Sequence, residues 1–152
     1  PTLMDNLCPQ QPSTLRFFSK LEGDIVGRTA FVGRTGYTGE DGFEVILSDS
    51  DGPQVWEHLI DQGMLPCGLG SRDILRMEAG LALHGTDIDS TTTPLEAGLG
   101  RFVKLDKDFV GADILRHQQT DLHKQLVGLI VEGRSLPRHH YPIQDNGKLI
   151  ER

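Results

Sequence analysis

Two apolar stretches between residues 24 and 47 predict β-strands. Residues 24–34 are rich in β-branched and aromatic side chains, which suit a pleated, half-buried surface, and residues 43–47 form a second such run. The segment between them, residues 35–42, has three glycines within the seven positions 36–42. The pattern therefore predicts a hairpin or a pair of sheet strands joined by a shaped glycine-rich loop.

Helical spacing of apolar residues follows further along the chain. A helix is predicted to begin with Asp51 as its N-cap and to end at Gly63. A second helix is expected with Ser71 as N-cap and Gly80 just after its last turn. Residues 111–119 predict a third, short helix.

The last third of the chain reads as β-rich. Residues 101–105 predict a strand, and residues 126–131 are expected to open a new all-β segment after a polar linker. The dipeptide Asn146-Gly147 is typical of a type I′ hairpin turn, in which both central residues need positive φ. The second strand of that hairpin has barely begun at Arg152, so we expect the chain to be a fragment of a longer polypeptide.

The order of these elements favours the α+β class over a doubly wound α/β fold. The predicted hairpin is an antiparallel signal, and strands and helices do not alternate as a clean βαβ series. We expect an antiparallel sheet with packed helices over residues 1–123. Residues 124–152 are expected to begin a second, β-rich domain, a small β-barrel.

Composition narrows the functional classes. Of 152 residues, 37% are hydrophobic and 24% charged, which is typical of a globular domain. The net charge is −7 and the sequence has no stripe of Lys and Arg, which argues against nucleic-acid binding. The longest apolar runs are far shorter than a membrane span. Cys8 and Cys67 match no disulfide framework or zinc spacing, so reduced thiols are expected.

Three motifs resemble phosphate or metal sites but lack residues that such sites require. The glycines of Gly68-Leu-Gly70 lack the Gly-Lys-Ser/Thr ending of a phosphate loop, and a tight turn into a helix explains them better. A calcium loop starting at Asp87 would need Gly and Glu where Thr92 and Gly98 stand. The adjacent pair His139-His140 fits an exposed loop better than a metal site.

Glu44 interrupts an apolar strand. By alternation it shares one face with Ile46, whereas Phe43, Val45 and Leu47 share the other. If both faces are covered, the carboxylate needs an arginine or a ligand that donates two hydrogen bonds. The alternative is an ordinary glutamate on a solvent-exposed face. Other candidates are Tyr37 in the glycine-rich loop and Arg72 and Arg76 near a helix start.

At these residues the chain resembles the family of the glycine-cleavage T-protein, aminomethyltransferase. The resemblance covers about residues 15–150 and rests on several motifs in the correct order. These are RTGYTGEDGFE (34–44), CGLGSRDILRMEAG (67–80), GTDID (85–89), TPLEAGLG (93–100) and KDFVG (107–111).

The resemblance implies a transfer reaction. An aminomethyl group on the lipoyl arm of the H-protein would pass to tetrahydrofolate, giving 5,10-methylenetetrahydrofolate and ammonia. The implied partners are therefore the lipoylated H-protein and folate, in the bacterial cytoplasm or the mitochondrial matrix. The family's catalytic aspartate lies upstream of this segment, so no catalytic base is expected here and the fragment alone is expected to be inactive. A strand edge left uncovered would let such a fragment self-associate.

The resemblance also implies roles for individual residues. Glu44 would receive the 2-amino and N3 hydrogens of the pterin, and Tyr37 would pack against the ring system. Arg72 would contact the folate or hold the pocket, with Arg76 behind it. His84 stands where the family usually has Tyr, which puts an aromatic contact there in doubt.

Two other readings remain open at this stage. Folate-binding domains of dimethylglycine- and sarcosine-oxidising enzymes, and related demethylases, share much of the pattern. A non-enzymatic superfamily member that maintains iron–sulfur clusters is the alternative of another class, although Cys67 does not reproduce the expected cysteine motif. With no ligand at all, Glu44 and Arg72 would form an ordinary ion pair.

Overall fold

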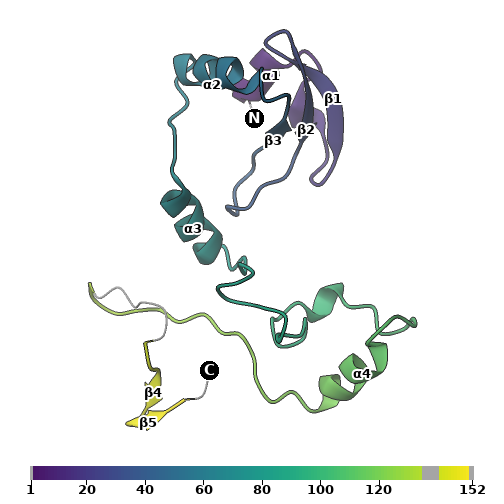
Figure 1. Ribbon diagram of the computed structural model, residues 1–152, viewed down its shortest axis with the longest axis vertical. Helices are drawn as coiled ribbons and strands as arrows, with labels where there is room; N and C mark the ends of the chain where they lie inside the picture. Colours follow the sequence, from purple (N-terminus) through teal and green to yellow (C-terminus); the bar gives the residue numbers. More distant parts are fainter. Residues whose placement is uncertain (1, 135–140, 151–152) are drawn as a thin grey trace. The chain divides into compact units, whose positions relative to one another are not determined.

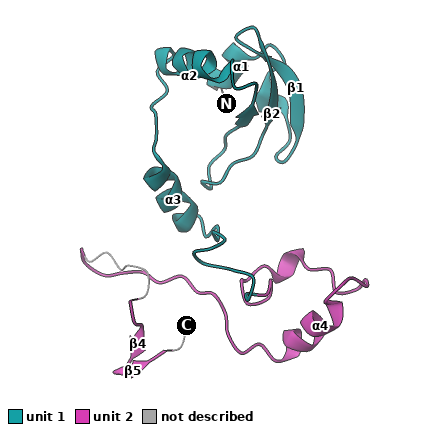
Figure 2. Ribbon diagram, viewed as in Figure 1, with its two compact units in different colours: residues 1–92 teal, residues 93–152 magenta. Residues whose placement is uncertain are grey.

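The computed structural model describes residues 2–134 and 141–150, which form two compact units. Unit 1 spans residues 1–92 and unit 2 spans residues 93–152 (Figure 2). Unit 1 holds all of the residues for which the sequence predicts a role in ligand binding. The domain boundary expected near residue 124 stays a prediction.

A three-stranded antiparallel sheet is the centre of unit 1. Its strands are β1 (Lys20–Ile25), β2 (Arg28–Gly33) and β3 (Glu44–Ile46), in the order β1-β2-β3. Lys20 lies opposite Gly33, which in turn lies opposite Glu44. The predicted strand at residues 43–47 is thereby confirmed, and so is the antiparallel sheet.

The two faces of this sheet differ in burial. The buried side chains of Ile25, Ala30 and Val32 lie on the inner face, which α1 (Thr2–Leu7) and α2 (Gly52–Asp61) cover (Figure 1). A short 3-10 helix, η1 (Pro12–Thr14), follows α1. The core cluster joins these strand residues to Leu7 at the end of α1, the adjacent Cys8, and Val55 of α2. Partly buried apolar residues pack against the cluster: Leu3, Met4, Leu21, Phe43, Val45, Leu47 and Leu59. Helix and sheet thus bury one apolar face each against the other.

The outer face of the sheet stays exposed. Phe31 is 47% and Ile46 69% exposed, and they lie opposite each other in the register of β2 and β3. Glu44 is exposed on the same face, whereas Val45 points to the core. The predicted alternation along β3 is confirmed. Of the two readings of Glu44, the structure shows the exposed one.

The prediction of a single strand over residues 24–34 is wrong, because β1 and β2 meet there in a tight turn. Val26 and Gly27 form this turn with φ of 54° and 76°. Both values are positive, as the type I′ two-residue hairpin turn requires. A β-branched residue adopts positive φ only at a cost. Val26-Gly27 is therefore not one of the dipeptides from which such a turn is predicted.

The helices begin less predictably than they end. Gly63, with φ of 89°, follows α2, and Gly80, with φ of 70°, follows α3 (Leu69–Glu78), so both predicted stops are confirmed. Asp51 is the N-cap of α2, as predicted, but its side chain makes no capping bond. The N-cap of α3 is Gly68 in extended conformation rather than Ser71, which lies inside the first turn. No side-chain capping bond fixes either start.

In unit 2, the strand predicted at residues 101–105 is wrong. A 3-10 helix, η2 (Gly100–Phe102), occupies its first half. The backbone is satisfied locally, since Phe102 N donates to Leu99 O at 2.9 Å and Val103 N to Gly100 O at 3.0 Å. The predicted third helix is confirmed as α4 (Ala112–Thr120).

The end of the chain contains one confirmed and one wrong prediction. The hairpin of β4 (Gln144–Asp145) and β5 (Lys148–Leu149) turns at Asn146 and Gly147, with φ of 50° and 82°. Residues 126–131 have no regular secondary structure, because the described part of the chain provides no strand to pair with them. A β-barrel beginning there stays a prediction. None of the described helices is long and apolar enough to span a membrane.

Candidate functional site

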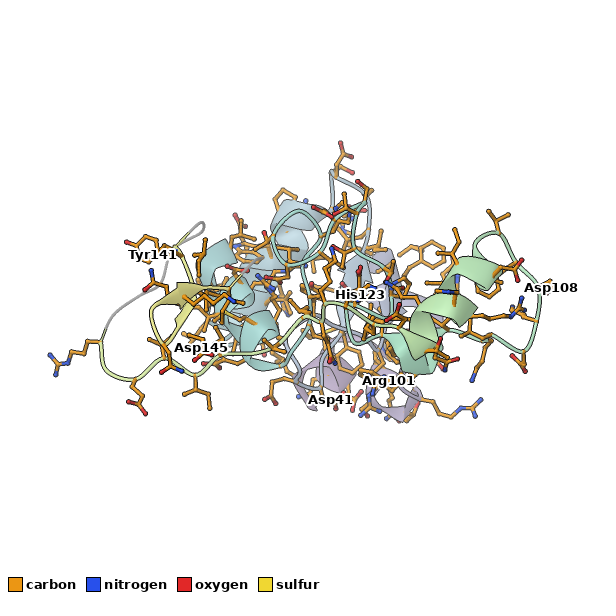
Figure 3. The ribbon with its side chains drawn as sticks, turned by 90° about the horizontal axis from the view of Figure 1, so that it is seen from below. Asp41, Arg101, Asp108, His123, Tyr141 and Asp145 are labelled. Atoms are coloured by element: carbon orange, nitrogen blue, oxygen red, sulfur yellow. The ribbon has the colours of Figure 1, made fainter. Side chains whose placement is uncertain are left out.

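A bidentate ion pair closes the glycine-rich loop at residues 35–42. Arg34 donates from Nε to Oδ1 of Asp41 at 2.9 Å and from Nη2 to Oδ2 at 2.8 Å. Its Nη1 donates to the carbonyl oxygens of Ser13 and Leu15, each at 2.7 Å. Arg34 therefore ties both ends of the loop to the segment before β1. Asp41 is labelled in Figure 3.

The charge of Asp41 makes this closure pH-dependent. The hydrogen bond from Arg34 holds the pKa of Asp41 below its usual range. A lowered pKa means that the pair stabilises the loop above the usual aspartate pKa, and that this contribution is lost as the pH falls through the lower folded-state value. We expect the protection factors of the amide hydrogens in residues 35–42, which compare the observed exchange rate with the intrinsic rate at each pH, to fall only below about pH 4. Asp41→Asn should remove that acid transition, and an unchanged transition in this variant would contradict the assignment.

Tyr37 and Arg72 lie together although 35 positions separate them. The Tyr37 hydroxyl donates to the carbonyl oxygen of Ala82 at 2.5 Å, with that of Leu81 at 3.5 Å. The Arg72 guanidinium carbon lies 4.6 Å from the centre of the Tyr37 ring. A cation at this distance is attracted to the ring face. Tyr37 thus joins the glycine-rich loop to the segment after α3 and carries Arg72 on its ring.

Gly39 brings the same loop against the end of α3. A Cβ at Gly39 would lie 2.6 Å from Cβ of Ala79, closer than two side-chain carbons can approach. The φ of Gly39 is also positive, at 77°. Only glycine satisfies both conditions, which explains the glycine at this position of the loop.

Arg76 is buried, with 3% of its surface exposed. It donates from Nε to Oδ1 of Asp73 at 2.8 Å, and from Nη1 to Leu81 O at 3.2 Å and to the carboxylate of Asp87. Burial lowers the pKa of Arg76, but the hydrogen bonds to Asp73 and Asp87 outweigh burial and the net shift is upward. All three partners come from α3 or the segment after it, so Arg76 holds that segment against the helix.

Asp87 completes this connection. Its Oδ2, which receives Arg76, also accepts a hydrogen bond from Leu83 N at 2.9 Å. The turn continues with a bridge between His84 and Ile88. Asp87 therefore fixes the segment whose carbonyl groups hold Tyr37. The sequence excludes a calcium loop at Asp87 and gives no signal of this structural role.

Glu44 lies in a separate cavity of about 290 Å³ on the outer face of the sheet. Phe31 and Ile46 contribute apolar side chains to it, and Lys20 a cation. Neither Tyr37 nor Arg72 lines this cavity, so Glu44 and Arg72 are not brought together as an ion pair. Within residues 2–134 and 141–150, no ion pair of Glu44 is found.

A second cavity of about 430 Å³ lies over the glycine-rich loop. Its lining includes Phe17, Phe18, Arg34, Gly39 and Leu81. Phe18 also lines the Glu44 cavity. Among the described residues it is the one that the linings of these two cavities share. No sequence motif marks Phe18 as a candidate site residue.

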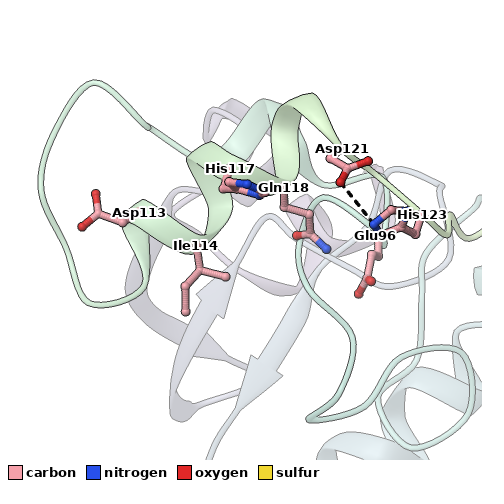
Figure 4. Close-up of a pocket in the computed structure, with 7 residues that line it drawn as sticks. All are labelled: Glu96, Asp113, Ile114, His117, Gln118, Asp121 and His123. Atoms are coloured by element: carbon pink, nitrogen blue, oxygen red, sulfur yellow. Dashed lines mark ion pairs between the residues drawn. The ribbon is translucent and has the colours of Figure 1, made fainter.

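Unit 2 has its own open cavity of about 550 Å³, beside α4 (Figure 4). His123 Nε2 lies 3.3 Å from Oδ2 of Asp121 at its edge. Glu96, also in the lining, accepts a hydrogen bond from Thr93 N at 2.8 Å while Thr93 Oγ1 accepts from Glu96 N at 3.3 Å. This reciprocal pair is a capping box for the turn that follows Thr93. Glu96 therefore has a structural role. His139 and His140, which the sequence placed in an exposed loop, lie outside the described residues.

These contacts lie in a segment that matches a known family. The family model of the GCVT N-terminal domain matches residues 2–107. The chain belongs to the GCVT N-terminal domain family. The resemblance to the glycine-cleavage T-protein that the motifs indicated is thereby confirmed, and Tyr37, Glu44, Arg72 and Arg76 all lie within the matched range.

Curated relatives support membership in the GCVT family. The chain is 46% identical to the aminomethyltransferase of Nostoc sp., over 99% of this chain and 39% of that protein. It is 50% identical to the aminomethyltransferase of Picosynechococcus sp., over 91% of this chain and 39% of the relative. The chain thus spans about two fifths of the length of the curated relatives it matches.

A solved structure from the GCVT family agrees. The glycine cleavage system aminomethyltransferase T from Bartonella henselae matches with a TM-score of 0.63 at 38% identity. The match covers 71% of this chain and 30% of the other. Sheet and helices of unit 1 are thus consistent with a GCVT-type α+β domain. These relatives support the T-protein interpretation over the oxidising-enzyme and iron–sulfur alternatives.

Proposed function

We propose that the protein is a tetrahydrofolate-dependent aminomethyltransferase of the glycine cleavage system. The aminomethyl carbon would leave the lipoyl sulfur of the H-protein and become the methylene group of 5,10-methylenetetrahydrofolate. Ammonia is released and the sulfur remains as a thiol. The relatives compared above are bacterial proteins, which favours the cytoplasm as the site of this reaction.

The carboxylate of Glu44 in its partly apolar cavity is the observation that carries this proposal. Two parallel N–H donors on one edge of a planar ring match the two oxygens of a carboxylate. The pterin of folate offers such an edge through its 2-amino group and N3. Phe31 and Ile46 in the same lining supply apolar surface for the ring, as ligand pockets commonly do.

Arg72, Tyr37 and Arg76 would serve the same ligand from α3 and the loop. Arg72 is exposed on Tyr37, so its guanidinium is accessible to an anionic part of the folate. Tyr37 holds Arg72 in place. Arg76 would act from behind, because its donors already bind Asp73, Asp87 and Leu81. A catalytic base is not assigned to any of these residues.

Calorimetric titration of tetrahydrofolate into the full-length protein tests the proposal. We expect Glu44→Gln to weaken binding about 10- to 30-fold, because one charge-assisted hydrogen bond is replaced by a clash between two N–H donors. Glu22→Gln is the matched control, since Glu22 is exposed on the same face of the sheet but does not line the Glu44 cavity.

The control variant should bind tetrahydrofolate like the wild type. Equal affinity in all three proteins would remove Glu44 from the folate site. A folded wild-type protein that does not bind tetrahydrofolate would refute the proposed function itself.

A further inference from the structure

Phe18 has an unusual backbone. Its φ is 63°, in the left-handed region that side chains with a Cβ rarely adopt. The conformation is held from both sides: Phe18 N donates to Arg34 O at 2.9 Å, and Arg34 N donates to Ser19 O at 2.9 Å. Neither glycine nor asparagine, the residues that relieve such strain, stands at this position.

The Phe18 side chain contributes little to the packing of the fold. It is 81% exposed, and its ring contact is with the neighbouring Phe17, at 4.4 Å between ring centres. The positive φ costs stability, and an exposed ring offsets little of that cost because it buries little apolar surface. Strain of this kind persists where the surrounding structure enforces it, and such positions cluster at ligand-binding and active sites.

Phe18 lies where two cavities of unit 1 meet. Phe18 lines both the Glu44 cavity and the cavity over the glycine-rich loop. In the first of these, the carboxylate that would bind the polar edge of a pterin lies in the same lining as the Phe18 ring. Tyr37, for which the resemblance implied ring packing, does not line that cavity and carries Arg72 on its own ring.

We propose that Phe18 is a ligand-contacting residue, whose ring packs against the flat pyrimidine ring of the tetrahydrofolate pterin, the same ring that Glu44 binds by its polar edge. This inference rests on the proposed function. Packing between two flat rings adds attraction beyond the area that it buries, and it requires the Phe18 ring to face the cavity. The strained backbone of Phe18 is then explained by the need to place its ring at the cavity.

Three variants of the full-length protein test this inference by pairing thermal stability with tetrahydrofolate affinity. Asparagine tolerates positive φ, so Phe18→Asn should raise Tm by about 2 °C while weakening tetrahydrofolate binding about 10-fold. Val26→Asn is the matched control, because Val26 has a similar φ of 54° and lines neither cavity. It should raise Tm without changing the affinity. Phe18→Tyr keeps a ring and should bind within about twofold of the wild type.

The outcomes separate the two proposals. Unchanged affinity in Phe18→Asn, together with weakened binding in Glu44→Gln, would overturn the role of Phe18 and leave the proposed function standing. A lower Tm in Phe18→Asn would show that the ring supports the fold, which also overturns the inference. No tetrahydrofolate binding by the folded wild type would overturn both proposals.

Discussion

Arg76→Met should lower the free energy of unfolding by about 3 kcal/mol. The guanidinium of Arg76 is buried and serves Asp73, Asp87 and Leu81 O at once. Methionine has similar length but no donors, so the Asp87 carboxylate loses its cation and the carbonyl of Leu81 loses a donor. Because Asp73 and Asp87 are themselves partly exposed, the expected loss lies at the lower end of the range for broken buried pairs. Urea-induced unfolding followed by circular dichroism measures it.

Arg28→Met is the control for this prediction. Arg28 also forms an ion pair within unit 1, with Asp51 at 3.4 Å, and a hydrogen bond to Gln54. Its side chain is 42% exposed, so water replaces the lost partners and the expected change is below about 1 kcal/mol. Similar losses for Arg28→Met and Arg76→Met would contradict the view that burial makes Arg76 important.

Gly39→Ala should cost about 2 to 3 kcal/mol. A φ of 77° is strained for alanine by about 1 to 2 kcal/mol, and the new Cβ would lie 2.6 Å from Cβ of Ala79. The loop must therefore move away from the end of α3, which also loosens the Tyr37 hydroxyl from Ala82 O. Thermal and urea unfolding measure the loss. Hydrogen exchange in residues 35–42 reports whether the loop has moved.

Two further variants separate the causes of this loss. Gly42→Ala lies in the same loop at an ordinary φ with nothing within 4 Å, so it should be neutral or slightly stabilising. Adding Ala79→Gly to Gly39→Ala removes the atom that clashes, and should recover the steric part of the loss but not the strain at positive φ. No recovery in the double variant would show that the contact with Ala79 does not limit the loop.

The features that could be predicted from the sequence are those in which one residue type decides the local backbone. Gly63 and Gly80 end helices, and Asn146-Gly147 turns a hairpin, because these residues accept positive φ with little strain. The alternation at Glu44 and Val45 was equally predictable, since a strand has a period of two.

The remaining features depend on contacts between distant residues. Val26 adopts a turn that valine disfavours because β1 and β2 pair on either side of it. The segment at residues 101–105 has β-type side chains, but a strand also needs a neighbour. Motif resemblance selected Tyr37 and Arg72 separately. Their contact depends on how the loop and α3 meet, which no local pattern contains.

The uncovered segment at residues 126–131 has a consequence for handling the protein. Its sequence, LVGLIV, has no charge and no proline and favours β-structure, and Ile130 is 97% exposed. Such a hexapeptide readily stacks with copies of itself into cross-β aggregates. Between chains, the opposing force is the repulsion due to a net charge of −7, which vanishes near the sequence pI of about 5.3. Concentrated solutions should therefore last longest well above that pH and at low ionic strength, where this repulsion is strongest.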